Sequence, residues 1–233
     1  MITDEQAKAF QELFKMGNTA MEKAADAGSY LSKLAFDPLK ELSGFATDEI
    51  RARRQQRAFE RILQSQRILL GRGIEPSQFV GLSDKMTVEL IDGASLEEDF
   101  TLQGMWSKLI ADSMDPNYRD CVHPGFIDVI KQLTPDEALI LQYLAQLPSF
   151  PTSYIPGFGN RPHTNEERLD EYLRAVQIKR RSLIPIYIDN LERLRLFELR
   201  SVHNAVGDQK VLFTDFGKTF LEAVFEMPPK AKP

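Results

Sequence analysis

The stretch NLERLRLFELRSVHNAVGDQKVLFTDFG, residues 190–217, decides the fold of the C-terminal part of this chain. It begins as the end of an amphipathic helix that Pro185 can start and that carries Ile188, Leu191 and Leu194. An alternating run at 197–203, a glycine-bearing turn and an apolar run at 210–213 then predict two short strands joined as a hairpin. A last helix is predicted over 215–225.

Two further helices are predicted upstream of this stretch. Thr134-Pro-Asp-Glu137 is a capping box with proline at the first helical position, and Thr164-Asn-Glu-Glu167 is another helix start. Residues 148–162 contain four prolines and two glycines, so we expect a turn-rich connection there. Three helices, a hairpin and a helix are the order of winged-helix domains. Residues 133–225 are therefore predicted to be winged-helix-like, and 226–233 a disordered tail.

A winged helix can contact either DNA or protein, so the fold does not decide the function. If it bound DNA, the helix over 185–195 would enter the major groove. The candidate contacts are Tyr187, Asn190 and Arg193 on that helix and the basic group Lys179, Arg180 and Arg181 before it. The same helix carries Asp189 and Glu192, which repel phosphate. A protein-contact or structural role is favoured.

Residues 1–132 are predicted to form a helical bundle, which makes the fold mainly α. A capping box at 3–6 precedes a long amphipathic helix whose small residues favour close helix packing, with membrane-surface activity as the alternative for residues 7–36. A helix over 47–71 carries six arginines. Arg51 and Arg54 are candidate nucleic-acid or partner contacts, and ion pairing with nearby acids is the simpler interpretation. Gly71-Arg-Gly73 is predicted to end this helix.

Three more helices complete the predicted bundle. One covers 83–91, and a second begins at the capping box Ser95-Leu-Glu-Glu98 and carries Trp106 inward. The acidic run 97–99 is typical of a helix start, where carboxylates oppose the helix dipole, more than of a metal site. The third begins at His123-Pro124.

Composition and motifs point away from an enzyme. The net charge of −5 does not suit a protein that binds mainly by neutralising phosphates, and a single cysteine, Cys121, excludes an internal disulfide framework. No stretch is apolar enough to span a membrane. The three histidines lack metal-ligand spacing, and no nucleophile motif or phosphate loop is found. We expect a cytoplasmic protein with no catalytic residues, cofactor or metal.

Seven short motifs in order resemble the abortive-infection alpha (Abi-alpha) family of bacterial proteins over roughly residues 30–225. They are Asp37-Pro-Leu-Lys-Glu-Leu42, Asp48-Glu-Ile-Arg51, Gly73-Ile-Glu-Pro76, Ala94-Ser-Leu-Glu-Glu-Asp99, Met105-Trp106-Ser-Lys-Leu-Ile110, Val122-His-Pro-Gly-Phe126 and Gln132-Leu-Thr-Pro-Asp-Glu-Ala138. The resemblance implies a role in defence against phage, in which an infected cell is arrested or killed. It transfers no catalytic or ligand residues.

Three hypotheses follow. The first is a non-enzymatic defence component that contacts a host or phage protein, with self-association left open. The second is a winged-helix transcription regulator that binds DNA. The third is an effector that perturbs membranes through a peripheral contact of residues 7–36.

Overall fold

The computed structural model describes residues 48–146, 152–155, 181–201 and 209–227, together with isolated positions between 174 and 178. The predictions for the N-terminal helix over 7–36, for His163 and His203, and for the extreme C-terminal tail lie outside these residues. The described residues group into two compact units, 48–96 with 110–119 and 97–109 with 120–227. The predicted domain boundary after residue 132 stays a prediction.

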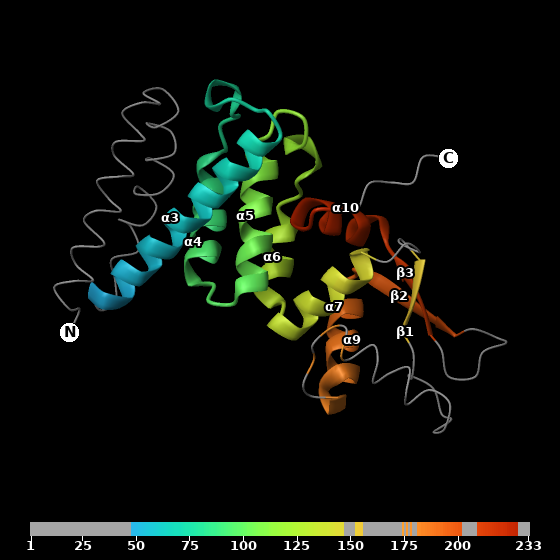
Figure 1. Cartoon of the computed structure of the whole chain (residues 1–233). Helices are drawn as coiled ribbons and strands as arrows, with labels where there is room; N and C mark the ends of the chain where they lie inside the picture. The colour runs from blue at the N-terminus through green and yellow to red at the C-terminus, as the bar shows by residue number, and fades with distance from the viewer. Residues whose placement is uncertain are drawn as a thin grey trace. The chain divides into compact units, whose positions relative to one another are not determined.

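In the first unit, α3 (Asp48–Gly71) packs against α4 (Asp84–Leu96) (Figure 1). The apolar positions of α3 are buried at Ile62 and Leu69, whereas Ile50 and Leu70 are 50% and 45% exposed. These two flank the buried stripe of the helix, so its apolar pattern is wider than the face that packs.

The predicted end of α3 is confirmed. Gly73 has a φ of +77°, its N–H donates to the carbonyl of Leu70, and the N–H of Ile74 donates to the carbonyl of Leu69. This pair of bonds is a Schellman motif, in which glycine takes the left-handed position. Ile74 and Leu69 are both buried, as the apolar contact of that motif requires. The 3-10 turn η1 (Pro76–Gln78) follows.

The predicted capping box at Ser95 is wrong. Ser95 lies inside α4, which is longer than predicted, and its hydroxyl donates to the carbonyl of Asp92 (2.7 Å). The helix α5 (Phe100–Met114) is capped instead by Asp99, whose carboxylate accepts from the N–H groups of Thr101 and Leu102. An aspartate at the N-cap position caps a helix as well as a serine does. Ser95 is buried within α4 and so does not cap α5.

In the second unit, α6 (Gly125–Gln132) and α7 (Pro135–Gln146) follow η2 (Arg119–Cys121). The capping box before α7 is confirmed, because the backbone N–H of Thr134 donates to Glu137 (2.6 Å) and the N–H of Glu137 donates to the Thr134 hydroxyl (3.4 Å). The core of this unit includes the large buried side chains Trp106, Phe126, Ile127, Leu141, Leu191, Phe197 and Phe220. Buried Lys108 in α5 donates to the carbonyl of Glu222 (2.8 Å), near the negative end of a helix dipole.

The predicted hairpin is confirmed and gains a third strand. The strands β1 (Thr152–Ile155), β2 (Phe197–Ser201) and β3 (Gln209–Phe213) form an antiparallel sheet in the order β1-β3-β2. Phe197 pairs with Phe213, and their rings meet edge to face at 5.8 Å between centroids. The segment that holds β1 was predicted as a turn-rich connection, because four residues between two prolines give too short a pattern to read as a strand.

The other helices whose bounds the structure describes are η3 (Arg181–Leu183), α9 (Ile184–Arg193) and α10 (Asp215–Val224), and α9 packs against α7 (Figure 1). The mainly helical fold with a small antiparallel hairpin near the C-terminus is confirmed. Within the described residues, no helix is both long and apolar enough to cross a membrane.

The end of α9 and the start of α10 meet through backbone contacts. Arg195 has a φ of 58°, a left-handed conformation that residues other than glycine rarely adopt. Thr214, the N-cap of α10, donates its hydroxyl to the carbonyl of Arg195 (2.6 Å) and its N–H to the carbonyl of Leu196 (3.1 Å). Gly217 lies so close to Leu196 that an added Cβ would be 1.8 Å from the Leu196 carbonyl oxygen. The segment 214–217 therefore fixes α10 onto the turn that precedes β2.

Candidate functional site

The helix α9 is the first candidate contact site, because three of the predicted contact residues lie on it. Tyr187 is only 8% exposed, and its hydroxyl donates to the carboxylate of Asp136 in α7 (2.7 Å). Arg193 is exposed, and its guanidinium donates to Asn190 Oδ1 (2.6 Å) and Gln132 Oε1 (3.1 Å). Both polar groups therefore already bond within the second unit.

Asn190 is held by a buried carboxylate. Its amide nitrogen donates to Glu137 Oε1 at 2.8 Å, and Glu137 is only 1% exposed. The other oxygen of Glu137 accepts from the backbone N–H and the hydroxyl of Thr134 (2.6 and 2.9 Å). Because a buried carboxylate needs such donors, the capping box of α7 also fixes the orientation of Asn190 on α9.

The face of α9 that is exposed carries a different set of side chains. Pro185, Ile186, Asp189 and Glu192 are all exposed, and Ile186 is 60% exposed. Glu192 also accepts from the backbone N–H of Leu199 in β2 (3.2 Å). This face offers the apolar side chain of Ile186 together with two carboxylates and the guanidinium of Arg193.

The other predicted contacts lie elsewhere. Lys179 and Arg180 lie outside the described residues; Arg181 begins η3, and its side chain is not described. Arg51 and Arg54 are on α3, in the first unit. The guanidinium of Arg54 is 15% exposed and donates to Asp92 (2.6 Å) and to the Ser95 hydroxyl (3.0 Å), whereas Arg51 is half-buried. The α3 arginines thus belong to the first unit and the α9 contacts to the second.

Two more α3 arginines also pair with acids. Arg53 contacts Glu49 at 2.6 Å on the exposed face, and Arg61 lies 3.6 Å from Glu60. Burial lowers the pKa of Arg61 from its ordinary value, and the nearby Glu60 carboxylate opposes this shift.

A buried ion-pair network that the sequence did not indicate links α3 to the end of α5. Arg72 donates to Asp112 (2.8 Å) and Asp115 (3.0 Å), and its guanidinium lies 5.2 Å from the ring centroid of Tyr118. The side chain of Asp115 is fully buried. This aspartate also caps the following turn by accepting from the N–H of Asn117 (2.8 Å).

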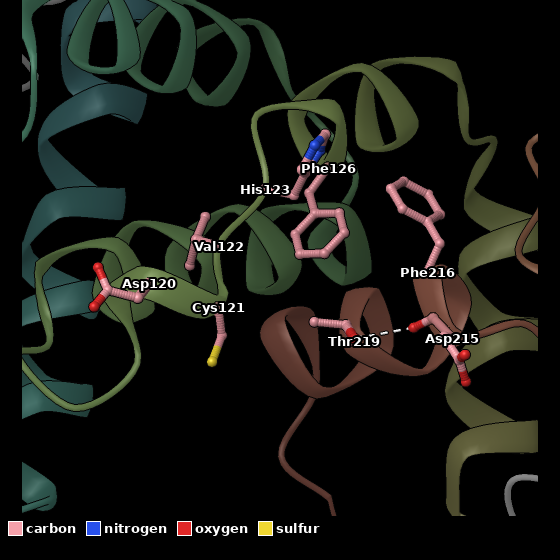
Figure 2. Close-up of a pocket in the computed structure, with 8 residues that line it drawn as sticks. All are labelled: Asp120, Cys121, Val122, His123, Phe126, Asp215, Phe216 and Thr219. Carbon is pink, nitrogen blue, oxygen red and sulfur yellow. Dashed lines mark hydrogen bonds between the residues drawn. The ribbon is translucent and has the colours of Figure 1, made fainter.

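A hollow of about 420 Å³ lies in the second unit, between the loop that leads into α6 and the first turns of α10 (Figure 2). Its lining residues are Asp120, Cys121, Val122, His123, Phe126, Asp215, Phe216 and Thr219. The rings of Phe126 and Phe216 are tilted by 59° to each other with centroids 5.2 Å apart, and the ring of His123 lies 6.0 and 6.1 Å from them. The hollow thus has an aromatic wall. Sequence reasoning missed it, because its wall comes from two segments, 122–126 and 213–217, that lie far apart in the chain.

Two polar side chains of this hollow make hydrogen bonds within the chain. The Nδ1 atom of His123 accepts from the N–H of Gly125 (3.0 Å), so the neutral ring carries its proton on Nε2. The hydroxyl of Thr219 donates to the carbonyl of Asp215 (2.9 Å). Within the described part of the chain, no three potential ligands gather as a metal site would require.

Comparison with known proteins gives one match. The model of a family described as abortive infection alpha matches residues 51–224, which is most of the chain. No curated protein matches the sequence significantly. No solved structure matches it significantly either.

Proposed function

The chain belongs to the abortive infection alpha family, and from this membership we propose that it is a component of bacterial defence against phage that acts through protein contacts and catalyses no reaction. The family supports the defence role. The observation that carries the choice of protein contacts is the exposed face of α9, where Ile186 is 60% exposed and lies one turn from the exposed Asp189.

This face suits a protein better than DNA. DNA readers place positively charged and amide side chains toward phosphates and base edges. On α9, the hydroxyl of Tyr187 and the amide nitrogen of Asn190 already bond to the carboxylates of Asp136 and Glu137. Two exposed carboxylates on the same helix would approach phosphate unfavourably, whereas an exposed isoleucine with a charged rim resembles the centre and edge of a protein interface.

The test is protection of cells against phage by surface variants of α9. The double variant Ile186→Ser/Asp189→Lys changes only exposed side chains, so the thermal midpoint should stay within about 2 °C of wild type. We expect plaque numbers on cells that express this variant to return toward those on cells without the protein. The matched control is Val88→Ser/Asp128→Lys, which alters an exposed valine on α4 and an exposed aspartate on α6.

Protection that is equal for wild type, test variant and control would argue against contacts through α9. The transcription-regulator alternative is separated by fluorescence anisotropy with duplex DNA at two salt concentrations. Tight binding at low salt that weakens steeply at high salt would support the regulator and overturn the proposal. The membrane alternative depends on residues 7–36, and liposome co-sedimentation with and without residues 1–36 tests it.

A further inference from the structure

The aromatic hollow between the α6 loop and α10 has the chemistry of a binding site. Phe126 is buried and is held from behind by Phe220, with ring centroids 5.5 Å apart. Phe216 is half-exposed and His123 is exposed, so their rings remain accessible beside the fixed ring of Phe126. A wall built in this way offers apolar area to a ligand without first having to reorganise its inner ring.

The charged groups of the hollow have one sign. Asp120 and Asp215 lie toward opposite sides of the view in Figure 2, with the aromatic rings and Val122 between them. Among its described lining residues there is no lysine or arginine. Lys218, which does not line the hollow, pairs with Asp215 at 2.9 Å on the surface of α10. Because such surface pairs are weak, a cationic side chain of a ligand can compete with Lys218 for this fully exposed carboxylate.

These features select the class of ligand. An anion such as a phosphate would face two carboxylates with no cation provided in the lining, so the hollow disfavours nucleotides. A cationic group gains from both carboxylates, and an apolar group beside it gains from the rings. Lysine and arginine combine an aliphatic stem with a charged end, and a neighbouring apolar side chain can fill the aromatic part.

We propose that this hollow binds a segment of a partner protein in which an aromatic or aliphatic side chain stands next to a lysine or arginine. The proposal deepens the protein-contact function and rests on it for the identity of the partner as a protein. It concerns a different surface from the outer face of α9. The volume of about 420 Å³ is large enough for two adjacent side chains of a peptide.

The only cysteine of the chain gives a direct test, because Cys121 is exposed and lines the hollow. The wild-type protein is equilibrated with disulfide probes made from 3-mercaptopropionyl dipeptide amides, in the presence of 2-mercaptoethanol as the competing thiol. Intact mass spectrometry then measures the fraction of protein that carries a probe on Cys121. The probes are Phe-Lys, Phe-Gln, Phe-Glu and Gly-Lys amides. They share one linker, so their capture differs only through contacts of the dipeptide. The Cys121→Ser variant gives the background.

We expect the concentration of 2-mercaptoethanol that releases half of the captured probe to be about tenfold higher for Phe-Lys than for Phe-Glu, with Phe-Gln between them. The reason is that two carboxylates attract the lysine through partly screened solvent. Phe-Lys should also exceed Gly-Lys by roughly tenfold, from partial burial of one phenyl ring. In Asp120→Asn/Asp215→Asn the preference for Phe-Lys over Phe-Glu should fall to about twofold or less. The charge-matched control Asp84→Asn/Asp128→Asn, at exposed positions outside the hollow, should keep the wild-type preference.

Three results would overturn the proposal: equal capture of Phe-Lys and Gly-Lys, stronger capture of Phe-Glu, or the same loss of preference in the control as in the test variant. These results do not depend on phage protection. The hollow can therefore fail while the α9 surface variants still abolish protection, or succeed while they do not, so the two proposals are refuted separately.

Discussion

Gly217 gives the sharpest test of the packing that holds the second unit together. A Cβ at this position would lie 1.8, 2.7 and 2.9 Å from the carbonyl oxygen, carbonyl carbon and Cα of Leu196. All three are backbone atoms of the turn between α9 and β2, so no side chain can rotate away. Gly217→Ala must therefore move α10 away from Leu196.

That movement breaks identifiable contacts. The N–H of Thr214 donates to Leu196 at 3.1 Å, and the Thr214 hydroxyl donates to Arg195 at 2.6 Å and accepts from Gly217 at 2.9 Å. Loss of two such hydrogen bonds costs about 2 kcal/mol. Strained packing of the buried Phe220 adds on the order of 2 kcal/mol, and the better helix propensity of alanine returns about 1 kcal/mol. We expect the free energy of unfolding to fall by about 3 kcal/mol.

The measurement is guanidinium denaturation followed by fluorescence of the single tryptophan, Trp106, which is buried in the same unit. The control is Gly104→Ala on α5, where an added Cβ meets no atom within 4 Å. This exposed helical position should gain up to about 1 kcal/mol. If Gly217→Ala were as stable as wild type, or if both alanines shifted the midpoint alike, close backbone packing at Leu196 would not be what requires glycine.

Three further substitutions test other contacts by the same denaturation measurement. Arg72→Met leaves the fully buried Asp115 side chain without its cation and should lower the free energy of unfolding by about 3 kcal/mol, whereas a change under 0.5 kcal/mol would show that the pair is not buried in solution. Arg195→Gly removes the left-handed strain and should raise it by up to about 1 kcal/mol, so a clear loss would contradict the assigned φ. Glu137→Gln turns an amide toward the donors of Thr134 or Asn190 and should cost about 2 kcal/mol; a neutral result would mean that the carboxylate is not the acceptor.

Several local features could be predicted because the groups involved are near neighbours in the chain. The capping box of α7 and the glycine that ends α3 each use hydrogen bonds between residues three to five positions apart. The failure at Ser95 has the same origin. Ser95 and Asp99 lie four residues apart, and both have a side chain that can accept hydrogen bonds at a helix N-terminus. Only tertiary contact, in which Arg54 donates to the hydroxyl of Ser95, decides that Asp99 is the cap.

The residue types and their order by themselves determined that the chain is mainly helical, where α7, α9 and α10 begin, and that a hairpin stands before the last helix. Tertiary structure alone decided which polar side chains are used internally, as with Asn190 on Glu137, 53 positions away. It also added β1, whose pairing with β3 joins residues 152 and 212. It built the aromatic hollow from two motifs about 90 residues apart. Contacts between such distant residues depend on how whole helices pack, and no local pattern of a single sequence encodes them.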